Sequence, residues 1–299
     1  MDPSSCPDTE DEITQEAQKG LLDGENKSGL LASSERAAIR ILKHPLYPWG
    51  VRRILIIFLV LIIFSGLFGP KDPHQNVATV FSWMLWWPIV AVSYLLIGRA
   101  WCGICPMGAL SVVFHRRFGL NLKPPGLLNR RRVILIICVS AILSLAWLEE
   151  ITHASITPLI TGLIALVFTF GACACGVLFE GWVWCRHLCP LGAISGAFSM
   201  SSMIEIRADQ KICDDNQCVD RYCYYGTEDQ PGCPLKQAPK IMASNVYCIM
   251  CGNCIKACPH DAIRIYLRPP GSEGVRQPRS KPEHAFISVV MMGIVFFQG

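Results

Sequence analysis

The sequence has few charged residues for its length. Only 17% of its 299 residues are charged, whereas about a quarter of the residues in an ordinary soluble domain are. Hydrophobic residues make up 52% of the chain, and the mean hydropathy is +0.36. This shortage of charge indicates membrane segments rather than a wholly soluble protein.

Several signatures of enzymes and of nucleic-acid binding are also missing. The sequence has no Cys-x-x-Cys-His haem site, no glycine-rich nucleotide fingerprint in a strand–helix context and no obvious acid–base pair. Its basic residues cluster beside apolar runs, which is typical of membrane flanks and gives no sign of nucleic-acid binding. These absences favour an electron carrier or an oxidoreductase subunit over a stand-alone enzyme.

The first 25 residues lack the basic start, apolar core and cleavage site of a secretory signal peptide. Acidic residues dominate this stretch, and Lys19 is its one basic residue. A run of arginines and a lysine follows it directly. We therefore expect residues 1–50 to form a disordered acidic tail and a basic membrane flank, with the N-terminus in the cytosol.

Four long uncharged apolar runs come next, and each approaches the length that crosses a bilayer. They are Ile54–Phe68, Val77–Gly98, Val133–Leu148 and Pro158–Phe179. A fifth run, Ala285–Gly299, has the length of a truncated span. The sequence thus predicts an α-helical protein with four to five transmembrane helices, embedded in membrane lipid.

The distribution of basic residues predicts the orientation of these helices. The loop from Arg99 to Arg132 holds seven lysine and arginine residues. The loop between the first two runs holds one, Lys71, and the turn between the third and fourth runs holds none. Because cytosolic loops are enriched in lysine and arginine, the Arg99–Arg132 loop is expected in the cytosol. By alternation, the cysteine-rich stretch at residues 201–270 is expected there too.

An internal repeat is visible in the membrane region. Residues 101–110, WCGICPMGAL, are similar to residues 184–194, WCRHLCPLGAI, although the second motif has one more residue between its cysteines. Each motif follows a pair of apolar runs. We therefore expect residues 51–200 to form two repeated hairpins, each ending in a Cys-Cys-Pro motif.

The most specific motif is the run Cys248-x2-Cys251-x2-Cys254-x3-Cys258-Pro259. This spacing is typical of bacterial ferredoxins, in which three close thiolates bind one [4Fe–4S] cluster and the fourth cysteine binds the other. A zinc site, which needs only four thiolates and usually takes them from two distant pairs, fits this run poorly.

A second, looser set of cysteines lies upstream. It consists of Cys213, Cys218, Cys223 and Cys233, and the last is followed by proline. Alone, this set could equally form disulfides or bind zinc, but beside the first run it predicts a two-cluster domain. In the crossed arrangement, one [4Fe–4S] cluster takes Cys213, Cys218, Cys223 and Cys258, and the other takes Cys233, Cys248, Cys251 and Cys254. We expect a small α+β ferredoxin-like domain at residues 201–270, then a linker and the start of a fifth span at 271–299.

The two Cys-Pro motifs have three competing interpretations. We expect Cys102, Cys105, Cys185 and Cys189 to meet at the cytosolic membrane face and to hold a further iron–sulfur centre or another soft metal. The alternatives are tight turns, with Pro106 and Pro190 beginning the next helices, or a redox-active dithiol.

Together, these motifs resemble the membrane polyferredoxins of the NapH, NosR and CcoG type, from about Arg52 to Arg268. Two of the chain's departures from the family pattern concern its cysteines: Cys102 and Cys105 are separated by two residues where three are usual, and the upstream cysteine run is stretched. The resemblance implies a multi-pass protein of the bacterial inner (cytoplasmic) membrane. It also implies electron exchange with a quinone or quinol, and with a redox partner protein that is often periplasmic.

We therefore predict a membrane-bound electron-transfer protein of a respiratory or metalloenzyme-maturation system. The alternative is a metal-handling or assembly protein, in which the membrane-face cysteines perform copper or disulfide chemistry and the ferredoxin acts as reductant. A sensor that couples its clusters to a regulator is a third interpretation of the same thiolates.

Overall fold

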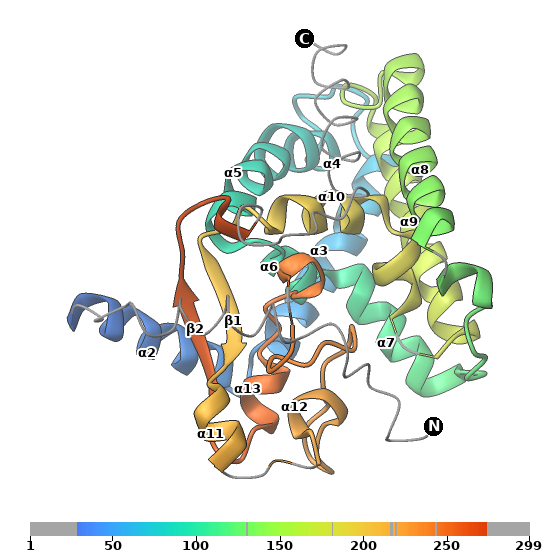
Figure 1. Ribbon diagram of the computed structural model, residues 1–299. Helices are drawn as coiled ribbons and strands as arrows, with labels where there is room; N and C mark the ends of the chain where they lie inside the picture. Colours follow the sequence, from blue (N-terminus) through green and yellow to red (C-terminus); the bar gives the residue numbers. More distant parts are fainter. Residues whose placement is uncertain are drawn as a thin grey trace.

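The computed structural model describes residues 29–273, apart from residues 130, 181, 216, 217, 219 and 243 (Figure 1). The acidic tail at residues 1–25 and the predicted fifth run, Ala285–Gly299, lie outside the described residues. Within the segment expected as tail and basic flank, residues Gly29–Lys43 form helix α2. This helix packs against strand β2 and helix α13 of the cysteine-rich region.

Four helices are long and apolar enough to cross a membrane, which confirms the four predicted apolar spans. They are Trp49–Phe68 (α3), Val77–Ile97, Val133–Thr152 within α8 (Arg131–Thr152) and Pro158–Leu178 (α9). The second span is divided into α4 (Val77–Thr79), a π-helical segment η1 (Val80–Trp86) and α5 (Trp87–Ile97). Pro88 lacks the N–H that would bond one turn back, and the wider π turns directly precede it.

The first and fourth spans cross at two glycines. A β-carbon added at Gly66 would lie 2.7 Å from the Cα atom of Gly162. Small residues at a crossing let two helix backbones approach closely, which strengthens packing between membrane helices. The second span is tied to the same place, because Trp83 Nε1 donates a hydrogen bond to Thr161 Oγ1 at 3.0 Å.

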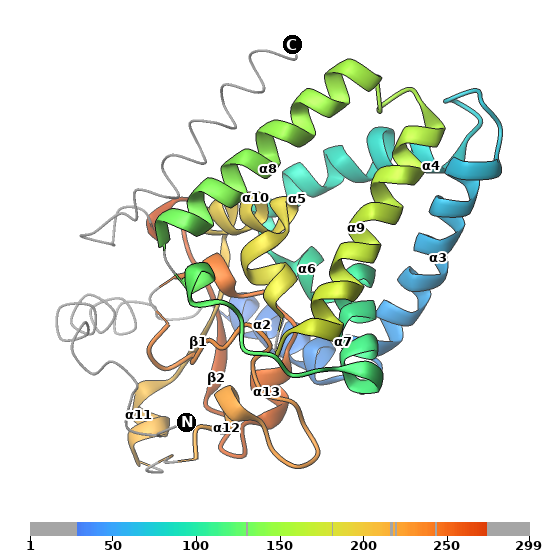
Figure 2. The same cartoon turned by 90° about the vertical axis from the view of Figure 1, so that its right-hand side faces the viewer.

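Short helices continue each Cys-Pro motif. The first motif runs through α6 (Ala100–Ile104) into α7 (Pro106–Phe118), and the second runs through η3 (Trp184–Leu188) into α10 (Pro190–Ser199). Helix α7 packs against α9 and α3, whereas α10 packs against α5 and α8 (Figure 2). Each motif therefore leads into a helix that contacts a span of the other helical pair. A single-turn 3-10 helix, η2 (Gly126–Asn129), precedes α8.

The cysteine-rich region lies at one end of the spans, beside α6 and α10 (Figures 1 and 2). Strands β1 (Ile204–Ala208) and β2 (Ile263–Leu267) pair antiparallel. Between them come α11 (Gln210–Asp215), α12 (Tyr222–Tyr225), η4 (Asn245–Tyr247) and α13 (Asn253–Ala257). Ile206, Ile255 and Ile265 form its core with Leu42 from α2.

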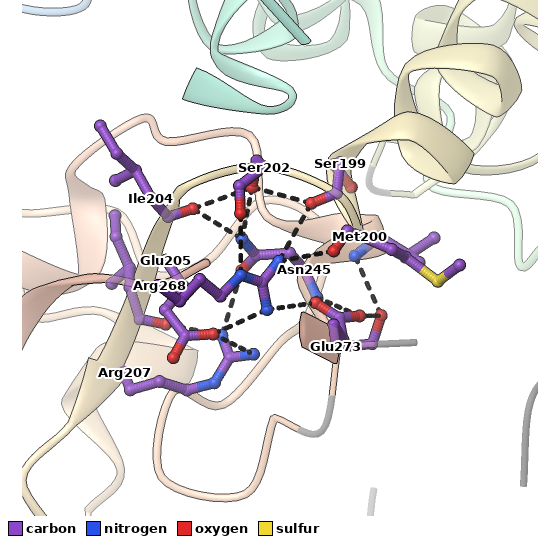
Figure 3. Close-up of polar contacts among 12 residues, drawn as sticks. Ser199, Met200, Ser202, Ile204, Glu205, Arg207, Asn245, Arg268 and Glu273 are labelled. Atoms are coloured by element: carbon purple, nitrogen blue, oxygen red, sulfur yellow. Dashed lines mark hydrogen bonds and ion pairs between the residues drawn. The ribbon is translucent and has the colours of Figure 1, made fainter. Parts of the chain in front are cut away.

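A buried polar network joins this sheet to the end of α10 (Figure 3). Arg268 is 4% exposed and binds Glu205 at 2.9 Å and Glu273 at 2.7 Å. Its second terminal nitrogen donates to the carbonyl oxygens of Ser199 and Met200 at 3.2 and 3.0 Å. The network fixes the cysteine-rich region against the membrane-spanning part.

Candidate functional site

Four cysteines line one cavity of the cysteine-rich region. This middle group consists of Cys233, Cys248, Cys251 and Cys254, and the cavity is otherwise lined largely by apolar residues such as Ile206 and Met242. Burial, together with the neighbouring Cys233, raises the pKa of Cys248 to about 11 and that of Cys251 to about 12. Neutral thiols in such a cavity are poorly solvated, and a soft metal centre would stabilise them as thiolates.

The loop that carries this group turns sharply at Gly252. Its φ of +76° lies in the left-handed region, which glycine adopts at no steric cost. The turn ends the extended segment around Cys248 and Cys251 and begins α13, which carries Cys254. Three closely spaced cysteines therefore face one centre.

A second set of four thiols lies further from the spans. This outer group consists of Cys213, Cys218, Cys223 and Cys258. Burial raises the pKa of Cys223 to about 12, with contributions from the neighbouring Cys218, Cys213 and Cys258. The structure thus brings Cys258 beside the upstream cysteines and Cys233 beside the ferredoxin run, in the two sets of the crossed arrangement. Which thiols bind each cluster stays a prediction.

The two Cys-Pro motifs form a third set. This membrane group consists of Cys102, Cys105, Cys185 and Cys189. Burial raises the pKa of Cys185 well above its usual value, and Cys189, Cys105 and Cys102 raise it further. The Cys189 thiol, whose pKa rises to about 12, accepts a hydrogen bond from the Gly192 amide at 3.3 Å. The structure therefore brings both motifs together, while their prolines begin α7 and α10 as the tight-turn interpretation also expects.

The membrane group lies directly against the ferredoxin loops. Leu235, Ile249 and Cys251 form a small apolar cluster, and Cys102 and Cys185 pack against it together with Trp182 and Tyr247. Arg186 Nη1 donates to the carbonyl oxygen of Leu235 at 3.3 Å, and its guanidinium lies over the Tyr247 ring. The Cys-Pro motifs and the ferredoxin region thus share one interface.

Three other cysteines lie within the spans. Cys138 is buried in α8 with its sulfur 3.7 Å from the carbonyl oxygen of His187, and Cys173 and Cys175 lie in α9. All cysteines in the described part of the chain are free thiols.

The donor set of each group fits an iron–sulfur cluster. In the part of the chain that the structure describes, no three His, Cys, Asp or Glu side chains are arranged to hold a single metal ion. A [4Fe–4S] cluster takes one thiolate at each of four irons, so its ligands stand further apart than those around a single tetrahedral ion. Soft thiolates are also the ligands that iron–sulfur clusters prefer.

The sequence did not reveal two of the residues that border these groups. Arg52 looks like an ordinary basic membrane flank in the sequence, yet it is 3% exposed and faces Cys251, Cys105 and Cys185. Trp182 covers the same interface. The one signal was the position of Arg52 at the start of an apolar run, and a basic membrane flank is a commoner explanation of that position.

Comparisons with known proteins agree with this picture. A family described as "4Fe-4S binding domain" matches residues 79–125 and 161–204, which contain both Cys-Pro motifs. A second family with the same description matches residues 246–264, which contain the ferredoxin run. The upstream cysteines Cys213, Cys218, Cys223 and Cys233 lie outside both matches. No solved structure matches the chain.

Three curated relatives are ferredoxin-type proteins. The chain is 28% identical to "Ferredoxin-type protein NapH" of Escherichia coli K12 over 60% of this chain and 66% of that protein. It is 26% identical to the NapH protein of Haemophilus influenzae over 60% of this chain and 67% of that protein. It is also 26% identical to "Methylamine utilization ferredoxin-type protein MauN" of Paracoccus denitrificans over 50% of this chain and 59% of that protein. The matches thus span about two thirds of the NapH proteins. With its apolar spans and its two matching 4Fe–4S families, the chain is similar to the NapH-type 4Fe–4S polyferredoxin proteins.

Proposed function

We propose that this protein moves single electrons between a membrane or cytosolic donor and a partner of a respiratory or metalloenzyme-maturation system. The observation that carries the proposal is the succession of three four-cysteine groups. Cys254 of the middle group faces Cys223 of the outer group, and Arg52 faces both Cys251 of the middle group and Cys105 of the membrane group. A succession of this kind suits electron relay and needs no substrate pocket.

The outer and middle groups would each hold a [4Fe–4S] cluster with crossed ligation, and the membrane group would hold a further iron–sulfur centre. When bound, such clusters accept and donate one electron each, at potentials set by net charge, burial and hydrogen bonds to sulfur. The chain supplies apolar packing around the thiolates and backbone donors to sulfur, including the Ala262 amide 3.4 Å from Cys258 Sγ. These contacts orient the ligands and exclude water from them.

The proposal includes an orientation in the bacterial inner membrane, with the ferredoxin region in the cytosol. Arg116, Arg117 and Lys123 lie on the segment that follows the first Cys-Pro motif, at the ferredoxin end of the spans (Figure 2). The loop at residues 69–76, between α3 and α4, lies at the other end, and Lys71 is its one lysine or arginine. This asymmetry supports a cytosolic ferredoxin region.

A quinone or quinol is the membrane partner that we propose, together with a redox partner protein that could stand on the periplasmic side. The membrane group supports this, because it follows directly from the ends of the spans and borders the bilayer. The names of the NapH and MauN relatives support a role in a larger redox system.

The test is metal analysis and reduction of the anaerobically purified full chain. The proposal expects iron and acid-labile sulfide in equal amounts, and bleaching of the cluster absorbance by dithionite and by a quinol. Stoichiometric copper without reducible iron would contradict it and favour the metal-handling alternative.

A further inference from the structure

Arg99 contacts both Cys-Pro motifs and the ferredoxin loop at once. It is 2% exposed and directly precedes α6. Its Nε lies 3.4 Å from Cys102 Sγ, its Nη2 donates to the Cys185 carbonyl oxygen at 2.7 Å, and its Nη1 donates to the Val246 carbonyl oxygen at 2.9 Å. Val246 lies two residues before Cys248, so one guanidinium holds together the membrane group and the loop of the middle group.

Arg52 occupies the same interface from helix α3. Its Nε donates to the carbonyl oxygen of Gly103 at 2.9 Å, inside the first Cys-Pro motif. Its guanidinium lies over the rings of Trp49 and Trp182 at 5.1 and 5.2 Å, which orients the cation. The positive charge of Arg52 acts on thiols of both the middle group and the membrane group. The charge of Arg99 does the same, because Arg99 faces Cys248 of the middle group and Cys102 of the membrane group.

Neither arginine has a carboxylate partner in the part of the chain that the structure describes. A buried cation is costly unless an anion or several hydrogen-bond acceptors compensate it. The anions nearest to these two guanidinium groups would be the thiolates of the middle and membrane groups. The two cations are therefore shared between the groups.

We infer that Arg52 and Arg99 are positioning residues for electron passage between the middle and membrane groups. This inference rests on the proposed function, in which both groups hold iron–sulfur centres. With both centres bound, one would lose one electron and be oxidised while the other would gain that electron and be reduced, and no bond or proton would change. A fixed cation facing both centres favours the more negative, reduced form of each, so it raises both reduction potentials together.

The shared position has a functional consequence. A cation beside one centre alone would shift the potential of that centre and so change the difference between the two potentials. Cations that face both centres shift the two potentials in the same sense, so they change that difference less. Arg99 also fixes the separation of the groups, because its fork binds a carbonyl oxygen on each side.

The test is a redox titration of the full chain in nanodiscs, followed by the EPR signals of the reduced centres. We expect Arg99→Gln to change the reduction equilibrium of the membrane centre about tenfold, a fall of about 59 mV for a one-electron couple. The middle centre should shift less but in the same direction. Arg99→Lys keeps the charge and should restore the potential of the membrane centre, although it loses the fork.

Arg116→Gln is the matched control, because Arg116 of α7 stacks on the same Trp49 ring as Arg52 at 5.4 Å but, among the described residues, does not bond to a Cys-Pro motif or to the ferredoxin loop. Its potentials should equal those of the wild type. Arg52→Gln gives an independent result, which does not depend on how the Arg99 variants fold, and should lower both potentials. Unchanged potentials in Arg99→Gln or Arg52→Gln would overturn the inference. A wild-type protein without a third centre would instead contradict the proposed function itself.

Discussion

The backbone of Gly103 lies directly against the carbonyl oxygen of Ile249. A β-carbon added at Gly103 would lie 2.2 Å from that oxygen, which is closer than real side chains approach. Gly103 follows Cys102 of the membrane group and Ile249 follows Cys248 of the middle group. The two centres that we propose are therefore held together by contact between two backbones, and no side chain separates them there.

This contact predicts the effect of Gly103→Ala. The added methyl group must push the ferredoxin loop away from the Cys-Pro motif, and such overpacking typically costs about 1–3 kcal/mol. We expect a lower thermal stability and a weaker magnetic interaction between the middle and membrane centres in EPR. Gly126→Ala is the control, because nothing lies within 4 Å of a β-carbon at that position. A Gly103→Ala protein with the stability and EPR signals of the wild type would contradict the close contact.

The buried network around Arg268 predicts a larger effect. Arg268→Met leaves the carboxylates of Glu205 and Glu273 buried without their cation, and breaking a buried ion pair from one side costs about 3–5 kcal/mol. Lys43→Met removes an exposed ion pair with Asp261 and should cost about 0–1 kcal/mol. The measurement is thermal unfolding in detergent, followed by loss of cluster absorbance. Equal melting temperatures for the two variants would show that the network contributes nothing to docking.

Crossed ligation predicts which EPR signal each cysteine variant loses. Cys258→Ala should damage the cluster of the outer group, because Cys258 faces Cys223 and Cys213 although it follows the ferredoxin run. Cys233→Ala should damage the cluster of the middle group, whose cavity it lines. If each variant instead loses the other signal, the ligation is uncrossed.

The orientation of the chain predicts the result of reporter fusions. A reporter enzyme that is active only in the periplasm should be active when fused at His74 and inactive when fused at Gly271. His74 lies in the loop at residues 69–76, whereas Gly271 follows β2 of the ferredoxin region. The reason is the excess of basic residues at the ferredoxin end. Periplasmic activity of the Gly271 fusion would reverse the topology and remove the ferredoxin from the cytosol.

Hydropathy and spacing predicted the parts of this protein that depend on neighbouring residues. Apolar runs predicted the four spans, because crossing a bilayer demands length and hydrophobicity that are visible in any sequence window. The ferredoxin run predicted an iron–sulfur site, because four cysteines in one short loop determine its geometry. The fifth run and the acidic tail lie outside the described residues and stay predictions.

Features that depend on distant residues could not be predicted in this way. The packing of α7 on α9, and of α10 on α5, is set by tertiary contacts that no local pattern reveals. The π turns at Val80–Trp86 follow from accommodating Pro88 within a span, and the apolar composition alone reads as an ordinary helix. Arg52 is a similar case, because its buried position depends on Trp182 and Gly103 from other segments.

The most direct test of the account is the iron and sulfide content of a variant in which Cys102, Cys105, Cys185 and Cys189 are all replaced by serine. If each of the three groups holds a [4Fe–4S] cluster, the wild type should contain about twelve irons per chain and this variant about eight. Cys138→Ser is the control, since Cys138 is buried in α8 outside all three groups and should leave the iron content unchanged. A quadruple variant that inserts and folds with the iron content of the wild type would contradict the third centre, and with it the electron path from the ferredoxin to the membrane.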